Sequence, residues 1–152
     1  MYKQVKNKYH VLVLNGPNLN LLGIREPEKY GNESLEDIIN ILYKKAKKKN
    51  FKLSHFQSNA EHKLINYLIR YKDIINYIIF NPGAFTHTSI ALRDTLLGIN
   101  IPFIEVHITN IYKREAFRNK SFFSDISNGI ILGLGTYGYI LALKMIFKRL
   151  LI

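Results

Sequence analysis

The sequence has no cysteine among its 152 residues. This absence excludes a disulfide scaffold, a cysteine zinc site, an iron–sulfur site and a catalytic thiol. The five histidines do not show a metal-ligand spacing such as H-E-x-x-H, so we expect no metal. Thiol and zinc chemistry are therefore set aside.

Long hydrophobic runs are also missing. The basic amino terminus is followed by an apolar run of only residues 11–14, which is too short for the core of a signal peptide. The longest uncharged stretch, residues 126–143, contains Ser127, Asn128 and four glycines. This composition favours a strand, a glycine turn and a helix over a membrane span. We expect a cytoplasmic protein that makes no contact with a membrane.

Acidic residues are scarce: 22 lysines and arginines face 11 aspartates and glutamates, a net charge of +11. The excess is local, because residues 1–10 and 44–52 carry nine lysines and no acid. Lysine outnumbers arginine 16 to 6, whereas a nucleic-acid groove more often uses arginine forks. A solvated lysine surface with no nucleic-acid partner is the preferred interpretation, and a basic nucleic-acid-binding domain stays open as an alternative.

Apolar, β-branched runs alternate with helical periodicities along the chain. Strands are expected at residues 11–14, 51–56, 77–80, 101–106 and 129–132, with helices between them and a closing helix at 139–151. Such alternation predicts a parallel α/β sheet covered on both faces. We expect a flavodoxin-like three-layer sandwich with a five-stranded parallel sheet, in which residues 1–152 form a single domain.

Three helix starts carry capping signals. Ser34 precedes Asp37 by three residues, and Ser58 precedes Glu61 by three, which is the capping-box spacing. Thr86 can cap the helix that follows the third strand.

Polar side chains follow four of the five predicted strands. Ligands of parallel α/β sheets bind at the carboxyl ends of the strands. The residues at these ends are Asn15 and Asn18, Gln57 and Ser58, Asn81, and Glu105 and His107. Arginines and a tyrosine lie in the long segments beside them: Arg25, Tyr30, Arg114 and Arg118. The sequence therefore predicts a polar pocket at this edge.

Two loops look functional. Residues 14–31, LNGPNLNLLGIREPEKYG, are too long for a tight connection and are typical of an active-site lid, although a surface loop with a salt bridge would read similarly. Residues 81–94, NPGAFTHTSIALRD, turn off a strand and open a helix whose free backbone amides favour an anion.

The segment after the fourth strand adds an acid–base pair and two cations. Glu105 and His107 are two residues apart, so on a strand both point to one face, where the carboxylate could set the tautomer of the imidazole. Arg114 and Arg118 are four apart and would share one face of a helix. Such a pair suits a carboxylate, although an ordinary surface helix would look the same.

Together these blocks resemble type II 3-dehydroquinate dehydratases from about Val11 to Leu143. The pattern is LNGPNLNLLG-x-REP-x-x-YG, N-x-G-x-x-THTS-x-ALRD, EVH-x-[ST]-N and RE-x-F-R. The one small departure is Thr109, where many relatives have serine. The resemblance implies dehydration of 3-dehydroquinate to 3-dehydroshikimate through an enolate, in the shikimate pathway, without a cofactor.

The resemblance also implies roles for individual residues. Tyr30 looks like the base beside Arg25, Asn18 like the enolate stabiliser, and His107 like the acid oriented by Glu105. The substrate-binding positions would be Asn81, His87, Ile108, Thr109, Arg114 and Arg118. Asp94 would reach the site of a neighbouring subunit in a trimer, and such trimers would build a dodecamer.

Two other interpretations concern a glycine pattern near residue 135 and a binding role without catalysis. Gly133, Gly135 and Gly138 match the dinucleotide-binding pattern G-x-G-x-x-G between a strand and a helix. That site also needs an acidic residue about 20 positions later to bind the ribose of the dinucleotide, but the last acidic residue of the sequence is Asp125. Close helix–strand packing explains these glycines better. A non-catalytic flavodoxin-like binding module remains possible, and the Arg25, Tyr30 and His107 set argues against it.

Overall fold

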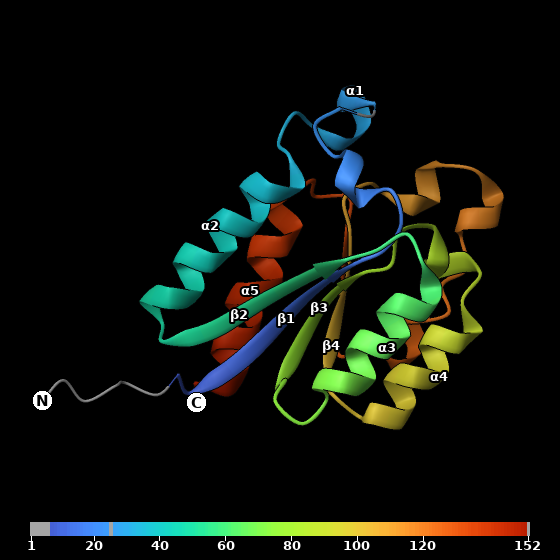
Figure 1. Ribbon diagram of the computed structural model, residues 1–152. Helices are drawn as coiled ribbons and strands as arrows, with labels where there is room; N and C mark the ends of the chain where they lie inside the picture. Colours follow the sequence, from blue (N-terminus) through green and yellow to red (C-terminus); the bar gives the residue numbers. More distant parts are fainter. Residues whose placement is uncertain (1–6, 25, 152) are drawn as a thin grey trace, which may run out of the picture.

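A computed structural model describes residues 7–24 and 26–151, except for the side chains of Lys29 and Tyr30 (Figure 1). Five strands form one sheet: β1 (Tyr9–Asn15), β2 (Phe51–Gln57), β3 (Tyr77–Asn81), β4 (Phe103–His107) and β5 (Ile130–Leu132). Their order is β2-β1-β3-β4-β5, and every neighbouring pair is parallel. The expected five-stranded parallel α/β fold is confirmed.

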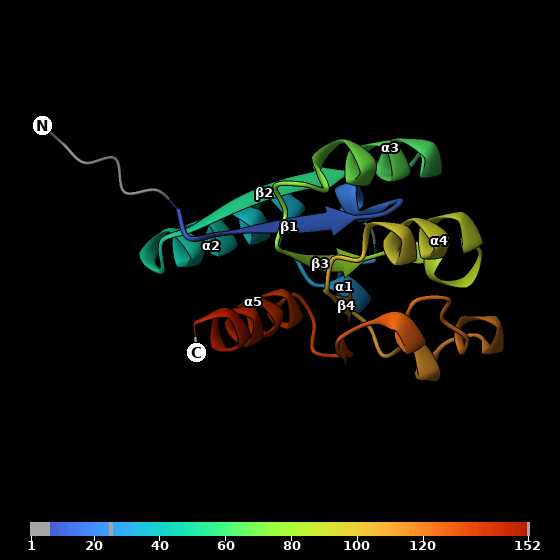
Figure 2. The same ribbon diagram turned by 90° about the horizontal axis from the view of Figure 1, so that it is seen from below.

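Helices cover both faces of this sheet (Figures 1 and 2). On one face lie α2 (Leu35–Lys48) and α5 (Tyr137–Leu150), and on the other lie α3 (Glu61–Tyr71) and α4 (Ile90–Ile99). Side chains alternate along each strand, so Val11 and Val13 belong to the α2–α5 core while Leu12 and Leu14 belong to the α3–α4 core. Each such fully buried side chain contributes about 1.5–3 kcal/mol.

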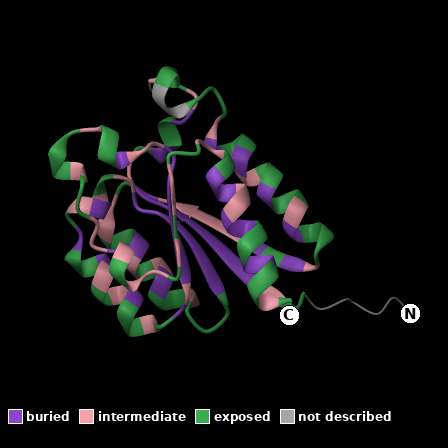
Figure 3. Cartoon of the chain, turned by 180° about the vertical axis from the view of Figure 1, so that it is seen from behind, coloured by how far each residue is buried: buried purple, intermediate pink, exposed green. Residues whose placement is uncertain are grey.

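Burial increases from the helices toward the sheet (Figure 3). Strands β1, β3 and β4 are buried along nearly their whole length, whereas β5 at the edge is half-buried to exposed. Charged side chains on the outer faces of the helices, such as Glu36 on α2, Lys63 on α3 and Lys148 on α5, are exposed to solvent. No helix within the described residues is long and apolar enough to cross a membrane.

The cap of α2 is the one the sequence predicts. Ser34 accepts a hydrogen bond from the amide of Asp37, and the Asp37 carboxylate accepts one from the amide of Ser34. Lysines occupy the last turn of α2, where positive charge interacts favourably with the helix dipole.

The other two predicted caps are wrong. Ser58 accepts a hydrogen bond from the amide of Ala60, and α3 begins at Glu61 without a side-chain cap. Thr86 lies in the 3-10 helix Gly83–His87 and donates its hydroxyl to the carbonyl of Gly83. Ser89 caps α4 instead, because its hydroxyl accepts from the amide of Leu92.

The glycines between β5 and α5 serve packing. Gly133 has a φ of 80°, which favours glycine, and a Cβ on Gly138 would lie 3.3 Å from a side-chain carbon of Ile131. This close approach agrees with the packing interpretation of the G-x-G-x-x-G pattern.

Candidate active site

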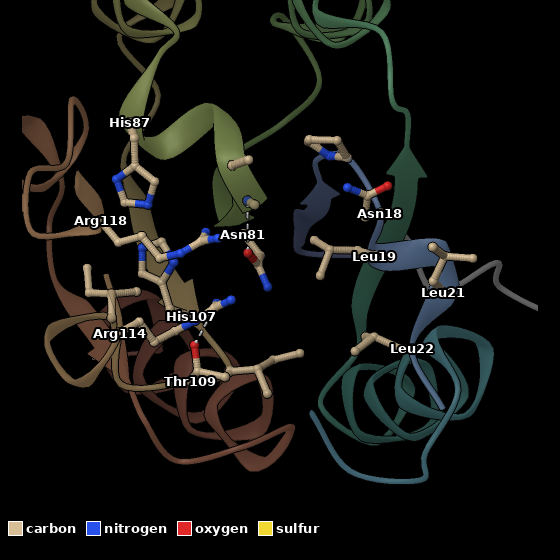
Figure 4. Close-up of a pocket in the computed structure, with 15 residues that line it drawn as sticks. Asn18, Leu19, Leu21, Leu22, Asn81, His87, His107, Thr109, Arg114 and Arg118 are labelled. Atoms are coloured by element: carbon tan, nitrogen blue, oxygen red, sulfur yellow. Dashed lines mark hydrogen bonds between the residues drawn. The ribbon is translucent and has the colours of Figure 1, made fainter. Parts of the chain in front are cut away.

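A pocket of about 260 Å³ opens at the carboxyl ends of β1, β3 and β4 (Figure 4). The chain leaves β1 toward β2 on one side and later returns to place β3 on its other side, so this is the switch point where parallel sheets bind ligands. The polar or charged lining residues are Asn18, Asn81, His87, His107, Thr109, Arg114 and Arg118. Leu19, Leu22 and Ile108 are among its apolar walls.

His107 and Glu105 form a buried pair on β4. Both side chains point to the same face of the strand, and His107 Nε2 lies 2.9 Å from a carboxylate oxygen of Glu105. A carboxylate can only accept, so Nε2 carries a hydrogen and the imidazole is held in one orientation. The remaining ring nitrogen, Nδ1, is the one able to exchange a proton with a ligand.

Glu105 receives two more donors from a later segment. The hydroxyls of Ser121 and Ser124 lie 2.7 Å and 3.0 Å from Oε1 of this fully buried carboxylate. Burial alone would raise the pKa of Glu105, but the hydrogen bonds from His107, Ser121 and Ser124 outweigh it and hold that pKa below the ordinary value. Glu105 is therefore a carboxylate at neutral pH.

His87 lines the same side of the pocket as His107 and is held there by the backbone (Figure 4). Its Nδ1 donates to the carbonyl of Lys120 at 2.7 Å. In the neutral ring Nε2 is then an acceptor, which suits a ligand hydroxyl.

Arg114 and Arg118 bring positive charge to the pocket. In one continuous helix the two arginines would share a face, but the segment forms two 3-10 helices, Ile111–Lys113 and Ala116–Arg118. Arg114 lies in extended conformation between them, and Arg118 ends the second. Both still line the pocket (Figure 4). No aspartate or glutamate lines it within the described part of the chain, so an anion is the ligand that its charge favours.

A hydrogen-bonded chain forms the floor beneath Asn81. Asn81 Nδ2 donates to the hydroxyl of Tyr139 at 2.8 Å, and that hydroxyl donates to Asn15 Oδ1 at 2.6 Å. Asn15 Nδ2 in turn donates to Nε2 of His55 at 3.0 Å. Burial raises the pKa of Tyr139 far above its usual range, so its hydroxyl stays protonated and fixes the amide of Asn81.

Gln57 at the end of β2 and Asn59 just after it support the β1 loop without lining the pocket. Gln57 donates to the carbonyl of Gly16, and Asn59 accepts from the amide of Asn18 and from Gln57. Asn18 itself has a φ of 67°, a left-handed conformation that asparagine tolerates. The predicted polar edge thus exists, with Gln57 and Ser58 outside the pocket lining.

The sequence profile described as "Dehydroquinase class II" matches residues 9–147. The chain belongs to the class II dehydroquinase family. It is 56% identical over 146 residues to the 3-dehydroquinate dehydratase of Proteus mirabilis, covering 96% of this chain and 99% of the relative.

Two solved class II dehydroquinases share the fold. The type II dehydroquinase of Butyrivibrio crossotus is 44% identical with a TM-score of 0.87, covering 90% of this chain and 96% of that one. The enzyme of Propionibacterium acnes is 37% identical with the same TM-score, covering 91% and 96%. The resemblance drawn from the motifs is therefore confirmed at the level of family and fold.

The structure brings together eight of the residues expected at a class II dehydroquinase site. They are Asn18, Asn81, His87, His107, Ile108, Thr109, Arg114 and Arg118. Glu105 lies directly behind His107. Asp94 is exposed on α4 and does not line this pocket.

The two remaining expected site residues, Arg25 and Tyr30, belong to the loop after β1. Arg25 lies outside the described residues, as does the side chain of Tyr30, whose backbone ends the short helix α1 (Pro27–Tyr30). Their roles stay predictions.

Three contributors were missed by sequence reasoning: Ser121, Ser124 and Tyr139. The two serines are three residues apart in SFFS, which was the only available signal, and nothing local links Tyr139 to Asn15. Within the described ranges, no group of three histidine, aspartate or glutamate side chains could hold a metal ion.

Proposed function

We propose that this protein is a 3-dehydroquinate dehydratase that removes water from 3-dehydroquinate to give 3-dehydroshikimate in the shikimate pathway, with residues 1–152 acting as one catalytic domain. The observation that carries the proposal is the Glu105–His107 pair in the wall of a cationic pocket at the sheet's switch point. Membership in the class II dehydroquinase family supports the same reaction.

The reaction needs a base, an enolate stabiliser and an acid. The base takes the proton from the carbon next to the ketone, and the electron pair of that C–H bond forms the enolate. When the enolate collapses, that pair forms the new C=C bond and the β C–O bond breaks. Protonated His107 gives its Nδ1 proton to the departing hydroxyl, which leaves as water, while Nε2 keeps its bond to Glu105.

Tyr30 is our proposed base. A tyrosine with an ordinary pKa near 10 needs about 4 kcal/mol to work as a phenolate at neutral pH. A cation about 4 Å away, at an effective dielectric constant near 20, supplies about that amount. Arg25, five residues earlier on the same loop, is the proposed source of this charge.

The remaining pocket residues are proposed to hold the substrate. Asn18, or a water that it binds, would stabilise the enolate oxygen. Asn81, His87 and the backbone at Ile108 and Thr109 would bind hydroxyls and the carboxylate, with Arg118 and Arg114 supplying positive charge. The hydrogen bond to Lys120 supports the role of His87, because it leaves an acceptor for a hydroxyl.

We further propose a dodecamer of trimers in which Asp94 reaches a neighbouring copy's site. Its exposure on α4, away from its own pocket, is consistent with that role. Light scattering of the pure protein measures the assembly, and a monomer would contradict it. The cytoplasmic location stays a prediction.

The activity test follows enone absorbance after 3-dehydroquinate is added. Wild-type protein should produce the enone, whereas Tyr30→Phe should fold normally and lose nearly all turnover. His107→Ala should act mainly on kcat, and a pure KM effect would instead indicate a binding role. Borohydride with substrate should leave the enzyme active, and a trapped lysine adduct would overturn the mechanism.

A further inference from the structure

We propose that Ser121 and Ser124 are positioning residues that keep the Glu105 carboxylate ionised and oriented, so that His107 retains the proton it delivers. This inference rests on the proposed function, in which His107 acts as the acid. It extends the site to a segment that touches none of the pocket's interior.

Three side-chain donors surround the Glu105 carboxylate. The Ser124 hydroxyl lies 3.0 Å from Oε1 and 2.8 Å from Oε2, and the Ser121 hydroxyl lies 2.7 Å and 3.2 Å from the same two atoms. His107 adds the third donor at 2.9 Å from Oε2. A fully buried carboxylate without water needs such donors, because its desolvation otherwise favours the neutral acid.

The serines are held by contacts that do not involve Glu105. Ser121 Oγ also accepts from the amides of Phe123 and Ser124, which closes the turn. Arg93 on α4 donates to the carbonyl of Phe122 and to both carboxylate oxygens of Asp125. The two serine hydroxyls are therefore already oriented toward Glu105 before the reaction, so little free energy is needed to orient them during it.

Few charged groups surround the pair. His107 is its partner on β4, Arg93 and Asp125 neutralise each other on the α4 side, and Arg114 and Arg118 lie on the pocket side. The residues in register with Glu105 on the flanking strands are Phe80 on β3 and Ile130 on β5. Among the described residues, the serines are thus the neutral donors that hold the negative charge.

Ser124→Ala is the sharper test, since the Ser124 hydroxyl bonds to Glu105 and Ser121 also braces the backbone. Losing a hydrogen bond to the charged Glu105 should raise its pKa by about one to two units. The fall in kcat that accompanies protonation of Glu105 should therefore begin at a pH higher by that amount, which moves the acidic limb of the kcat–pH profile up. KM at the plateau should change little, whereas the thermal midpoint at neutral pH should fall by about 4–8 °C, because the same lost hydrogen bond destabilises the folded carboxylate. Ser127→Ala is the matched control, because its hydroxyl donates to the carbonyl of Ser124 in the same segment without reaching Glu105.

Two outcomes of this assay would overturn the inference. A uniform fall in kcat with an unmoved acidic limb would indicate a merely structural role. An equal shift in Ser127→Ala would indicate displacement of the whole segment. Ser124→Thr, which keeps the hydroxyl, should return the limb toward its wild-type position.

A second readout does not need turnover. The chain has seven glutamates, so carboxyl-labelled glutamate gives a small set of ¹³C resonances, and Glu105→Gln identifies the one of interest. Its titration midpoint should rise by a similar one to two pH units in Ser124→Ala. An unmoved midpoint refutes the serine role even if the enzyme is active, and a raised midpoint in a protein without dehydratase activity refutes only the proposed function.

Discussion

Removing one hydroxyl from the pocket floor tests the buried network most directly. Tyr139→Phe deletes the group that donates to Asn15 and accepts from Asn81. Asn15 and Asn81 are 0% and 3% exposed, so water cannot replace the missing partner. Their other hydrogen bonds, to His55 and from the amide of Gly83, stay in place.

The loss of stability in Tyr139→Phe follows from two buried groups left without a partner, Oδ1 of Asn15 and Nδ2 of Asn81. Each costs about 1–3 kcal/mol, so the free energy of unfolding should fall by about 3 kcal/mol. For a chain of this length, about 3 °C of thermal midpoint corresponds to 1 kcal/mol, which predicts a loss of about 9 °C. The KM for 3-dehydroquinate should also rise several-fold, because the Asn81 amide that lines the pocket loses its anchor.

Urea denaturation and calorimetry measure the first effect, and steady-state kinetics measures the second. Tyr137→Phe is the matched control: Tyr137 is 50% exposed, and its hydroxyl bonds only to Lys144 at 3.4 Å within the described structure. That variant should stay within about 0.5 kcal/mol of wild type. If Tyr139→Phe behaves like the control, the network contributes no stability and the reasoning is refuted.

Two further predictions concern stability. Burial lowers the pKa of His55 to about 4, so between pH 6.5 and pH 4 the unfolded chain binds a proton that the folded chain does not bind. The free energy of unfolding should therefore be highest above pH 6.5 and fall by at most about 3 kcal/mol toward pH 4. Urea midpoints of His55→Gln should not show this pH dependence, apart from a contribution of His10, whose pKa burial also lowers. A slope unchanged in that variant would contradict the assignment. Gly16→Ala should lower the free energy of unfolding by about 3 kcal/mol, because the new Cβ would lie 2.1 Å from the carbonyl oxygen of Pro82. Gly98→Ala on α4 is the contrasting variant: its Cβ would meet nothing within 4 Å, so it should raise the free energy of unfolding by up to about 1 kcal/mol in the same urea assay. Equal stabilities for the two alanine variants would show that the β1 and β3 loops can separate freely.

Strand positions were predictable because burial enforces them locally. The five apolar runs each mark a strand, with bounds that differ by at most two residues from those in the structure. Capping was less predictable: Ser34 was correct, but the amide of Ser58 continues the sheet edge by donating to Asn15, so its helix starts later. Competing hydrogen bonds, which a sequence does not display, decided between alternative caps.

The pocket residues divide in the same way. Strand ends and a two-residue spacing predicted Asn81, Glu105 and His107, since parallel strands deliver these positions to one edge. Ser121 and Ser124 reach Glu105 only because the chain after Arg118 folds back, a path that no periodicity encodes. Their contacts bridge 16 and 19 residues.

The bond between Asn15 and Tyr139 spans 124 positions, from the first strand to the last helix. At a synthesis rate of about 5–20 residues per second, Tyr139 is added about 6–25 s after Asn15, so the hydrogen bonds of Asn15 stay incomplete for at least that time. Until α5 docks, the amide of Asn81 has no Tyr139 to hold it, so a nascent chain can pair β1 with β3 while its pocket floor is unfinished. Docking of α5, which follows all five strands in the sequence, therefore completes the pocket floor.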